Sequence, residues 1–127
     1  MKTQSMRRWW RAAVLAALLP FSGGLHAEDV VKLHVPQIVH EKEDLLVQIR
    51  LTRNADNQFM KVVAASSGYY GSSEMQLDGQ AASPLQTVRF RSLPAGWYEV
   101  IGAVYDSQYH MRGSARVSVL VYPYGAN

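Results

Sequence analysis

The chain is 127 residues long with a formal net charge of +3, but its charges are unevenly distributed. Four of the 13 basic residues and none of the 10 acidic ones lie in the first 27 positions, so residues 28–127 carry 9 basic and 10 acidic side chains. This balance removes the argument for a nucleic-acid partner from the basic pI of the whole chain, and the absence of cysteine excludes disulfides, thiol chemistry and cysteine-ligated metals.

The first 27 residues have the three-part layout of a secretory signal peptide. Basic residues at positions 2, 7, 8 and 11 precede an uncharged apolar run over residues 12–19, and Leu25-His26-Ala27 places a small residue at the end. The apolar run is shorter than the roughly 20 residues that a membrane-spanning helix needs. We therefore predict a signal peptide over residues 1–27, cleavage after Ala27, and a periplasmic or secreted protein.

Beyond residue 27 the hydrophobic pattern has a period of two, which is typical of β-strands. Pro36 interrupts the first strand and favours a kinked strand at a sheet edge, because proline lacks a ladder donor. The clearest alternation is in residues 45–53, whereas residues 59–65 are apolar on both faces, as in a central strand. The seven predicted strands are 30–39, 45–53, 59–65, 73–77, 85–91, 97–105 and 115–121.

Turn signals separate these strands. Residues 66–71 are predicted to form a loop or bulge, Asp78-Gly79 and residues 93–96 form turns, and residues 106–113 form a polar hairpin tip. Seven short strands in a domain of about 100 residues predict an all-β, seven-stranded antiparallel two-sheet sandwich over residues 28–127. Two layers are expected because each sheet has one apolar face to bury.

The segment from Leu93 to Val104, LPAGWYEVIGAV, resembles the corner and following strand of immunoglobulin-like and fibronectin type III domains. It also resembles the end of transthyretin-like and carboxypeptidase-regulatory-like modules. The resemblance implies an Ig-like sandwich in which Tyr98 makes a tyrosine corner, its hydroxyl bonding to the backbone upstream. The cysteines and the tryptophan between them that mark antibody domains are absent from this chain.

Aromatic residues give the leading functional hypothesis. Tyr69 and Tyr70 lie between glycines, and Trp97, Tyr105 and Tyr109 fall on or near the outward face and tip of the sixth predicted strand. Exposed aromatic residues of this kind mark recognition surfaces, although a neighbouring strand or loop can also cover such a face. We predict a non-enzymatic module that contacts another exported or envelope protein through the 69–70 loop together with the 106–113 hairpin.

Two alternative functions remain open at this stage. His110 and Met111 are a possible soft ligand pair for copper, which predicts a periplasmic copper carrier, although solvated hairpin residues explain the pair more simply. Trp97 and the tyrosines are equally a possible stacking platform of a carbohydrate-binding accessory domain.

Catalytic patterns are incomplete in this sequence. The serines near Tyr69 lack a G-x-S-x-G elbow, and the acidic run Glu41, Glu43 and Asp44 precedes a strand in a domain too small for a deep cleft. We predict no enzymatic activity and no cofactor.

Overall fold

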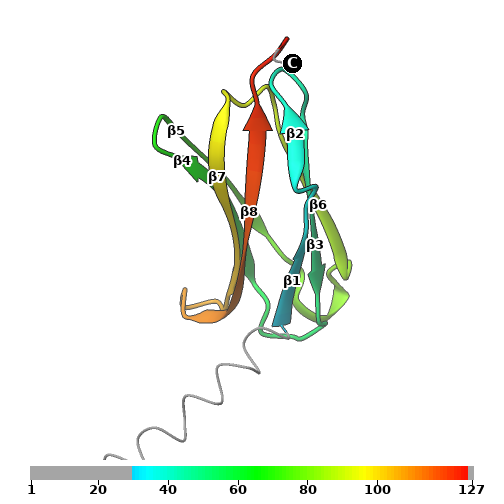
Figure 1. Cartoon of the computed structure of the whole chain (residues 1–127). Helices are drawn as coiled ribbons and strands as arrows, with labels where there is room; N and C mark the ends of the chain where they lie inside the picture. The colour runs from blue at the N-terminus through cyan, green and yellow to red at the C-terminus, as the bar shows by residue number, and fades with distance from the viewer. Residues whose placement is uncertain (1–29, 126–127) are drawn as a thin grey trace, which may run out of the picture.

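The computed structural model describes residues 30–125, so the predicted signal peptide lies outside the described residues. Within that range the chain forms eight strands, one more than predicted, and one short 3-10 turn, Gly79–Ala81 (Figure 1). No helix in residues 30–125 is long and apolar enough to cross a membrane. The strands are β1 (Val31–His34), β2 (Ile38–His40), β3 (Leu45–Leu51), β4 (Phe59–Ser66), β5 (Tyr69–Gln76), β6 (Leu85–Phe90), β7 (Gly96–Tyr105) and β8 (Met111–Tyr122).

The strands form two sheets that stack face to face (Figure 1). One sheet has the order β1-β3-β6, and the other has the order β2-β8-β7-β4-β5. The predicted all-β, two-sheet architecture is therefore confirmed, with β4 inside the larger sheet as expected. The prediction of a wholly antiparallel sandwich was wrong in one pairing, because β2 runs parallel to β8.

The predicted first strand, residues 30–39, is in fact two strands in different sheets. β1 pairs with β3, Val31 opposite Leu51, whereas β2 pairs with β8, Ile38 opposite Leu120. Pro36 lies between the two strands and cannot donate a ladder hydrogen bond, so the chain leaves one sheet there and joins the other. As a result, β2 covers only the last three residues of the twelve-residue strand β8.

The core lies between the two sheets and follows the alternation in the sequence. In β3, Leu45, Val47 and Ile49 are fully buried while the residues between them are exposed. The larger sheet contributes alternate residues of β4 and β7, such as Val62 and Val100. Burial of each such side chain stabilises the fold by about 1.5–3 kcal/mol before entropy is counted.

The predicted loop at residues 66–71 is largely strand. Ser66 pairs with Tyr69 and Ala65 with Tyr70, so only Ser67 and Gly68 form the turn between β4 and β5. Tyrosine favours strands, because its ring packs well on a pleated surface. Both tyrosines are therefore held in the sheet and are not free to move as loop residues.

Candidate functional site

A tyrosine corner holds the turn that leads into β7. The hydroxyl of Tyr98 donates a hydrogen bond of 2.7 Å to the carbonyl oxygen of Pro94, and the side chain is 2% exposed. The feature implied by the family resemblance is thus present. Burial raises the pKa of this hydroxyl above its ordinary value of 10.0, so it stays protonated and able to donate to a higher pH than an exposed tyrosine. The corner fixes the backbone on both sides of Trp97.

The carboxylate of Glu41 ties three segments together at the same end of the sandwich. It accepts hydrogen bonds from the backbone N–H of Tyr124 (3.1 Å) and of Ala95 (3.2 Å). These two bonds hold the pKa of Glu41 below its ordinary value of 4.5, and the bond from Tyr124 has the larger effect. The ammonium of Lys42 lies 4.2 Å from the ring centroid of Tyr124. The C-terminal segment and the turn before Trp97 therefore share one anchor.

We expect Glu41→Gln to lower the melting temperature at neutral pH, because the neutral amide accepts these bonds less strongly. A lowered folded-state pKa gives stability that is present above pH 4.5 and is lost as the pH falls through the folded value. Thermal unfolding of wild type and variant should therefore converge between about pH 5 and pH 2. Glu74→Gln, on the exposed face of β5, is the matched control and should show no such convergence. A pH-independent difference for Glu41→Gln would contradict the assignment.

Four apolar side chains gather on the outer face of the larger sheet near this anchor. Trp97 of β7 pairs with Leu120 of β8, which pairs in turn with Ile38 of β2, so the three lie in one row across the sheet. Trp97 is 69% exposed and Ile38 is 55% exposed. Tyr122, also exposed, lies two residues beyond Leu120 on the same face. We call Ile38, Trp97, Leu120 and Tyr122 the outer-face patch.

Three of these four residues were not anticipated from sequence. Leu120 and Tyr122 lie beside Trp97 through the antiparallel pairing of β7 with β8, and Ile38 joins them through the parallel pairing of β2 with β8, which no local pattern indicates. The one available signal was that Ile38 is out of phase with the alternation before Pro36. That phase change marks the residue as turned to a different face, but it does not identify the neighbouring strand.

The five predicted aromatic residues do not form one surface. Tyr70 pairs with Ala65 at one end of β4, and Tyr105 pairs with Phe59 at the other end, roughly 20 Å away at about 3.4 Å per residue. Tyr69 turns inward instead, and its ring centroid lies 6.0 Å from that of Tyr98. The structure therefore places the 69–70 segment and the 106–113 hairpin at opposite ends of the sheet (Figure 1).

The hairpin end has its own aromatic cluster. The ring of Tyr109 stacks on Phe59 with centroids 4.4 Å apart and planes 9° apart, and Tyr105 lies 6.3 Å from Tyr109. Tyr109 adopts a left-handed conformation with φ of 61°. Asp106 holds this turn, because its carboxylate accepts from the backbone N–H of Gln108 and His110. The hydrogen bond from His110 is the main reason that the pKa of Asp106 is lowered.

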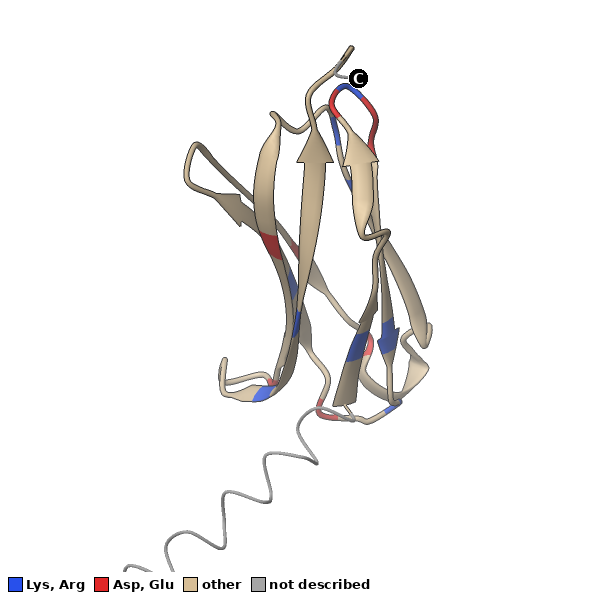
Figure 2. Ribbon diagram, in the orientation of Figure 1, with Lys and Arg blue, Asp and Glu red and all other residues tan. Residues whose placement is uncertain are grey.

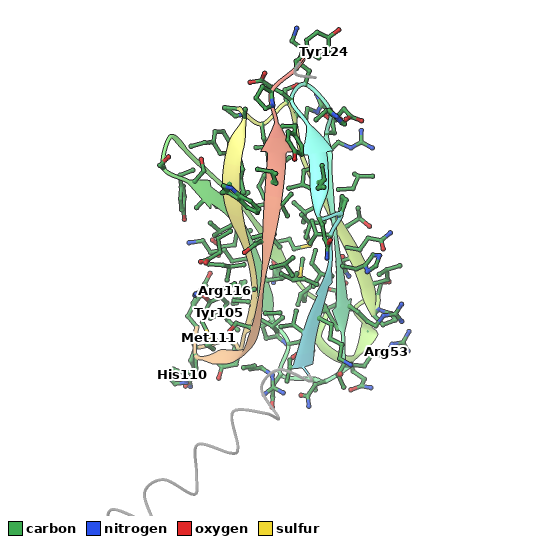
Figure 3. The ribbon with its side chains drawn as sticks, viewed as in Figure 1. Arg53, Tyr105, His110, Met111, Arg116 and Tyr124 are labelled. Atoms are coloured by element: carbon green, nitrogen blue, oxygen red, sulfur yellow. The ribbon has the colours of Figure 1, made fainter. Side chains whose placement is uncertain are left out.

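The copper hypothesis depends on His110 and Met111, which both lie exposed at this hairpin (Figure 3). The Nδ1 atom of His110 lies 3.5 Å from the Asp106 carboxylate. His40 is engaged with Glu43 at 3.1 Å near the other end of the sandwich. Residues 30–125 contain no group of three or more histidine, aspartate or glutamate side chains placed to hold a metal ion. Copper binding by His110 and Met111 stays a prediction.

No protein-family model matches the chain, and no curated protein matches it significantly. Among solved structures, it is similar to the sulfur carrier protein SoxY from Chlorobium limicola f thiosulfatophilum, with a TM-score of 0.57 and 12% identity over 84% of this chain and 97% of that one. It is also similar to a family 76 glycoside hydrolase from a bovine Bacteroides thetaiotaomicron strain, with a TM-score of 0.55 and 14% identity over 76% of this chain.

The chain spans about a fifth (21%) of the length of that hydrolase. At these identities both likenesses concern the fold alone, and they support a β-sandwich without assigning a family. CopC from Methylosinus trichosporium OB3b has a TM-score of 0.48 and 19% identity over 76% of this chain and 99% of that one. This likeness is too weak to bear on the copper hypothesis.

Proposed function

We propose that this protein is an exported binding module that contacts another exported or envelope protein through the outer-face patch. The observation that supports the proposal most directly is the row Trp97–Leu120–Ile38, in which the two flanking side chains are more than half exposed. Large apolar side chains aligned in one row are costly to leave in water, and buried tryptophan anchors dominate protein interfaces. The proposal gives the chain a binding role and no catalytic one.

The rigidity of its support suits the patch to recognition. Trp97 follows the turn that Tyr98 and Glu41 hold in place, and Ile38 and Leu120 lie on paired strands. An anchored residue loses little conformational entropy when a partner binds, so more of the interaction energy becomes affinity.

A protein partner explains the composition of the patch better than a sugar. Ile38 and Leu120 are branched aliphatic side chains, which suit an apolar protein contact, whereas sugars stack on flat aromatic faces. Within the patch Trp97 and Tyr122 are the two flat aromatic rings, and Tyr70 lies two strands away from Trp97. The carbohydrate alternative is therefore kept as an outcome of the test.

The test is a comparative pull-down from the native periplasm with the full-length gene product carrying a C-terminal tag. Trp97→Ala and Ile38→Ala are expected to lose a protein that wild type retains, with affinity reduced about tenfold or more. Leu85→Ala is the matched control, because Leu85 is an exposed aliphatic residue on the other sheet. If both variants keep the melting temperature of wild type, the loss of the captured protein is due to weaker binding and not to unfolding.

Equal capture by Trp97→Ala and wild type would overturn the patch as the contact surface. An empty pull-down, combined with binding to a glycan array that Trp97→Ala abolishes, would replace the protein partner with a carbohydrate. Stoichiometric copper binding that disappears in the His110→Ala/Met111→Ala variant would favour the copper carrier instead.

A further inference from the structure

The open side of the sandwich between β1 and β8 is a surface separate from the outer-face patch. The N–H of Leu120 donates to the carbonyl of Gln37 (2.9 Å), so Leu120 turns its backbone groups away from β7. Alternate residues of a strand turn their backbone groups to the same edge. Ser118, Arg116 and Ser114 therefore present N–H and C=O groups there, where no strand within residues 30–125 pairs with them.

A groove of about 720 Å³ runs beside this open edge, with β1 as its other wall. Apolar side chains line it, among them Leu33 of β1 and Ala115 and Val117 of β8. Among the described strands β1 pairs with β3 alone, so its second edge also faces the groove. The groove thus combines unpaired backbone groups with an apolar lining, which are the two features that an added β-strand requires.

The rim of the groove is positively charged. Lys32 and Arg116 line it, and two adjoining hollows of about 380 and 320 Å³ are lined by Lys32 and Arg50. No aspartate or glutamate of residues 30–125 lines any of the three hollows. Figure 2 shows blue segments and no red ones on β1 and β3. Because residues 28–127 together are close to neutral, this concentration of positive charge is local.

The basic residues at the rim are poorly compensated. Lys32 lies directly opposite Arg50 in the β1–β3 register, and like charges at such positions destabilise a sheet. Neither side chain makes an ion pair within the described part of the chain. Arg116 has a carboxylate neighbour, Glu99, at 3.4 Å. An acidic ligand would relieve the repulsion between Lys32 and Arg50.

We propose that the open edge of β8 binds an extended acidic segment of another polypeptide as an added strand. Its backbone would pair with Ser114, Arg116 and Ser118. One set of its alternate side chains, apolar, would contact the lining, and the other set, acidic, would lie near the basic rim. A second copy of this chain is disfavoured as the occupant, because edge-to-edge pairing would bring the two basic rims together. The proposal for this surface and the proposal for the outer-face patch can be disproved independently of each other.

The probe is an eight-residue capped peptide of alternating valine and glutamate, titrated into isotope-labelled protein produced from the complete coding sequence. We expect amide chemical shifts to change in residues 112–118 and 31–34 and not at Trp97. The same peptide with lysine in place of glutamate should bind at least about tenfold more weakly, and added salt should reduce binding of the acidic peptide.

Two pairs of variants separate backbone pairing from charge. Ser114→Pro removes an N–H at the open edge without removing a bond to β7, and the preceding residue, Gly113, tolerates the restriction that proline imposes. Ser114→Ala, which keeps that N–H, is its control. Lys32→Glu/Arg116→Glu should reverse the preference to the lysine peptide, whereas Arg89→Glu, on β6, should not.

Several results would overturn the proposal. These are no binding of the glutamate peptide at millimolar concentration, equal binding of the two peptides, or shifts confined to the outer-face patch. If Ser114→Pro and Ser114→Ala bind alike, the ligand does not pair with the edge. If the amide chemical shifts of residues 112–118 change with protein concentration when no peptide is present, the edge binds a second copy of this chain. If nothing binds, the basic residues only protect the open edge from aggregation.

Discussion

Replacement of Tyr98 with alanine should lower the free energy of unfolding by about 3–5 kcal/mol, the range for truncating a large buried aromatic side chain. Tyr98 is 2% exposed and its ring lies 6.0 Å from that of Tyr69 between the sheets. Because a single domain is stable by only about 5–15 kcal/mol, this loss is a large part of the total. Urea denaturation followed by far-ultraviolet circular dichroism measures it.

Tyr98→Phe separates the hydroxyl from the ring. It should cost about 1 kcal/mol, since it removes the hydrogen bond to the Pro94 carbonyl and keeps the apolar volume. Tyr122→Phe, at an exposed tyrosine, is the control and should be neutral.

The pH dependence gives a second check on Tyr98. A raised folded-state pKa means that the stability due to the hydroxyl is complete below pH 10.0 and falls as the pH rises further, because the unfolded chain ionises first. The difference between wild type and Tyr98→Phe should therefore shrink above pH 10. A constant difference there, or a Tyr98→Phe variant as unstable as Tyr98→Ala, would contradict the role of the corner.

Replacement of Asn57 with alanine should lower the free energy of unfolding by about 2–3 kcal/mol. Asn57 is 1% exposed, and its side chain donates to the carbonyl of Thr52 (2.9 Å) and accepts from Nε of Arg112 (2.9 Å). These two bonds join the loop between β3 and β4 to the start of β8. Loss of the amide removes the neutral acceptor that holds the partly buried guanidinium of Arg112, whose carboxylate neighbour, Asp56, lies 3.7 Å away.

The control for Asn57 lies in the same loop. Asn54 is only partly buried, and its side chain accepts one solvent-exposed hydrogen bond, from the N–H of Asp56. Asn54→Ala should therefore cost less than about 1 kcal/mol. A double-mutant cycle with Arg112→Leu should show coupling of about 1 kcal/mol or more between positions 57 and 112. Equal effects of Asn57→Ala and Asn54→Ala, or purely additive effects in the cycle, would show that the buried amide does not join the two segments.

These two stabilising networks lie beside the two proposed contact surfaces. Tyr98 and Glu41 hold the turn before Trp97, next to the outer-face patch. Asn57 and Arg112 hold the start of β8, whose following residues form the open edge. We therefore expect Tyr98→Phe to weaken capture of the partner protein by the outer-face patch more than it weakens peptide binding at the β8 edge. Asn57→Ala should weaken peptide binding more than it weakens capture of the partner protein.

Much of the candidate site could not be predicted, and the reason is the same for each surface. The sequence indicated Trp97 as outward and aromatic, but its neighbours Leu120 and Ile38 come from strands about 20 and 60 positions away in the chain. Likewise, the 69–70 segment and the 106–113 hairpin were expected to act together, although β4 separates them by its full length. Pairing partners are a non-local property, so aromatic content alone does not show which rings share a surface.

The sequence by itself determined the all-β class and the buried faces of β3, β6 and β7, because side-chain alternation acts over a few residues. The tyrosine corner was implied by the family resemblance of residues 93–104, and the structure contains it. Only the tertiary structure decided that residues 30–39 divide between two sheets and that β2 runs parallel to β8. Pro36 ends the hydrogen-bond ladder of β1, and the residues that follow it can then pair with a strand of either sheet. Which sheet they join depends on packing with residues far away in the chain. That crossing places Ile38 beside Trp97 and leaves most of β8 with an open edge.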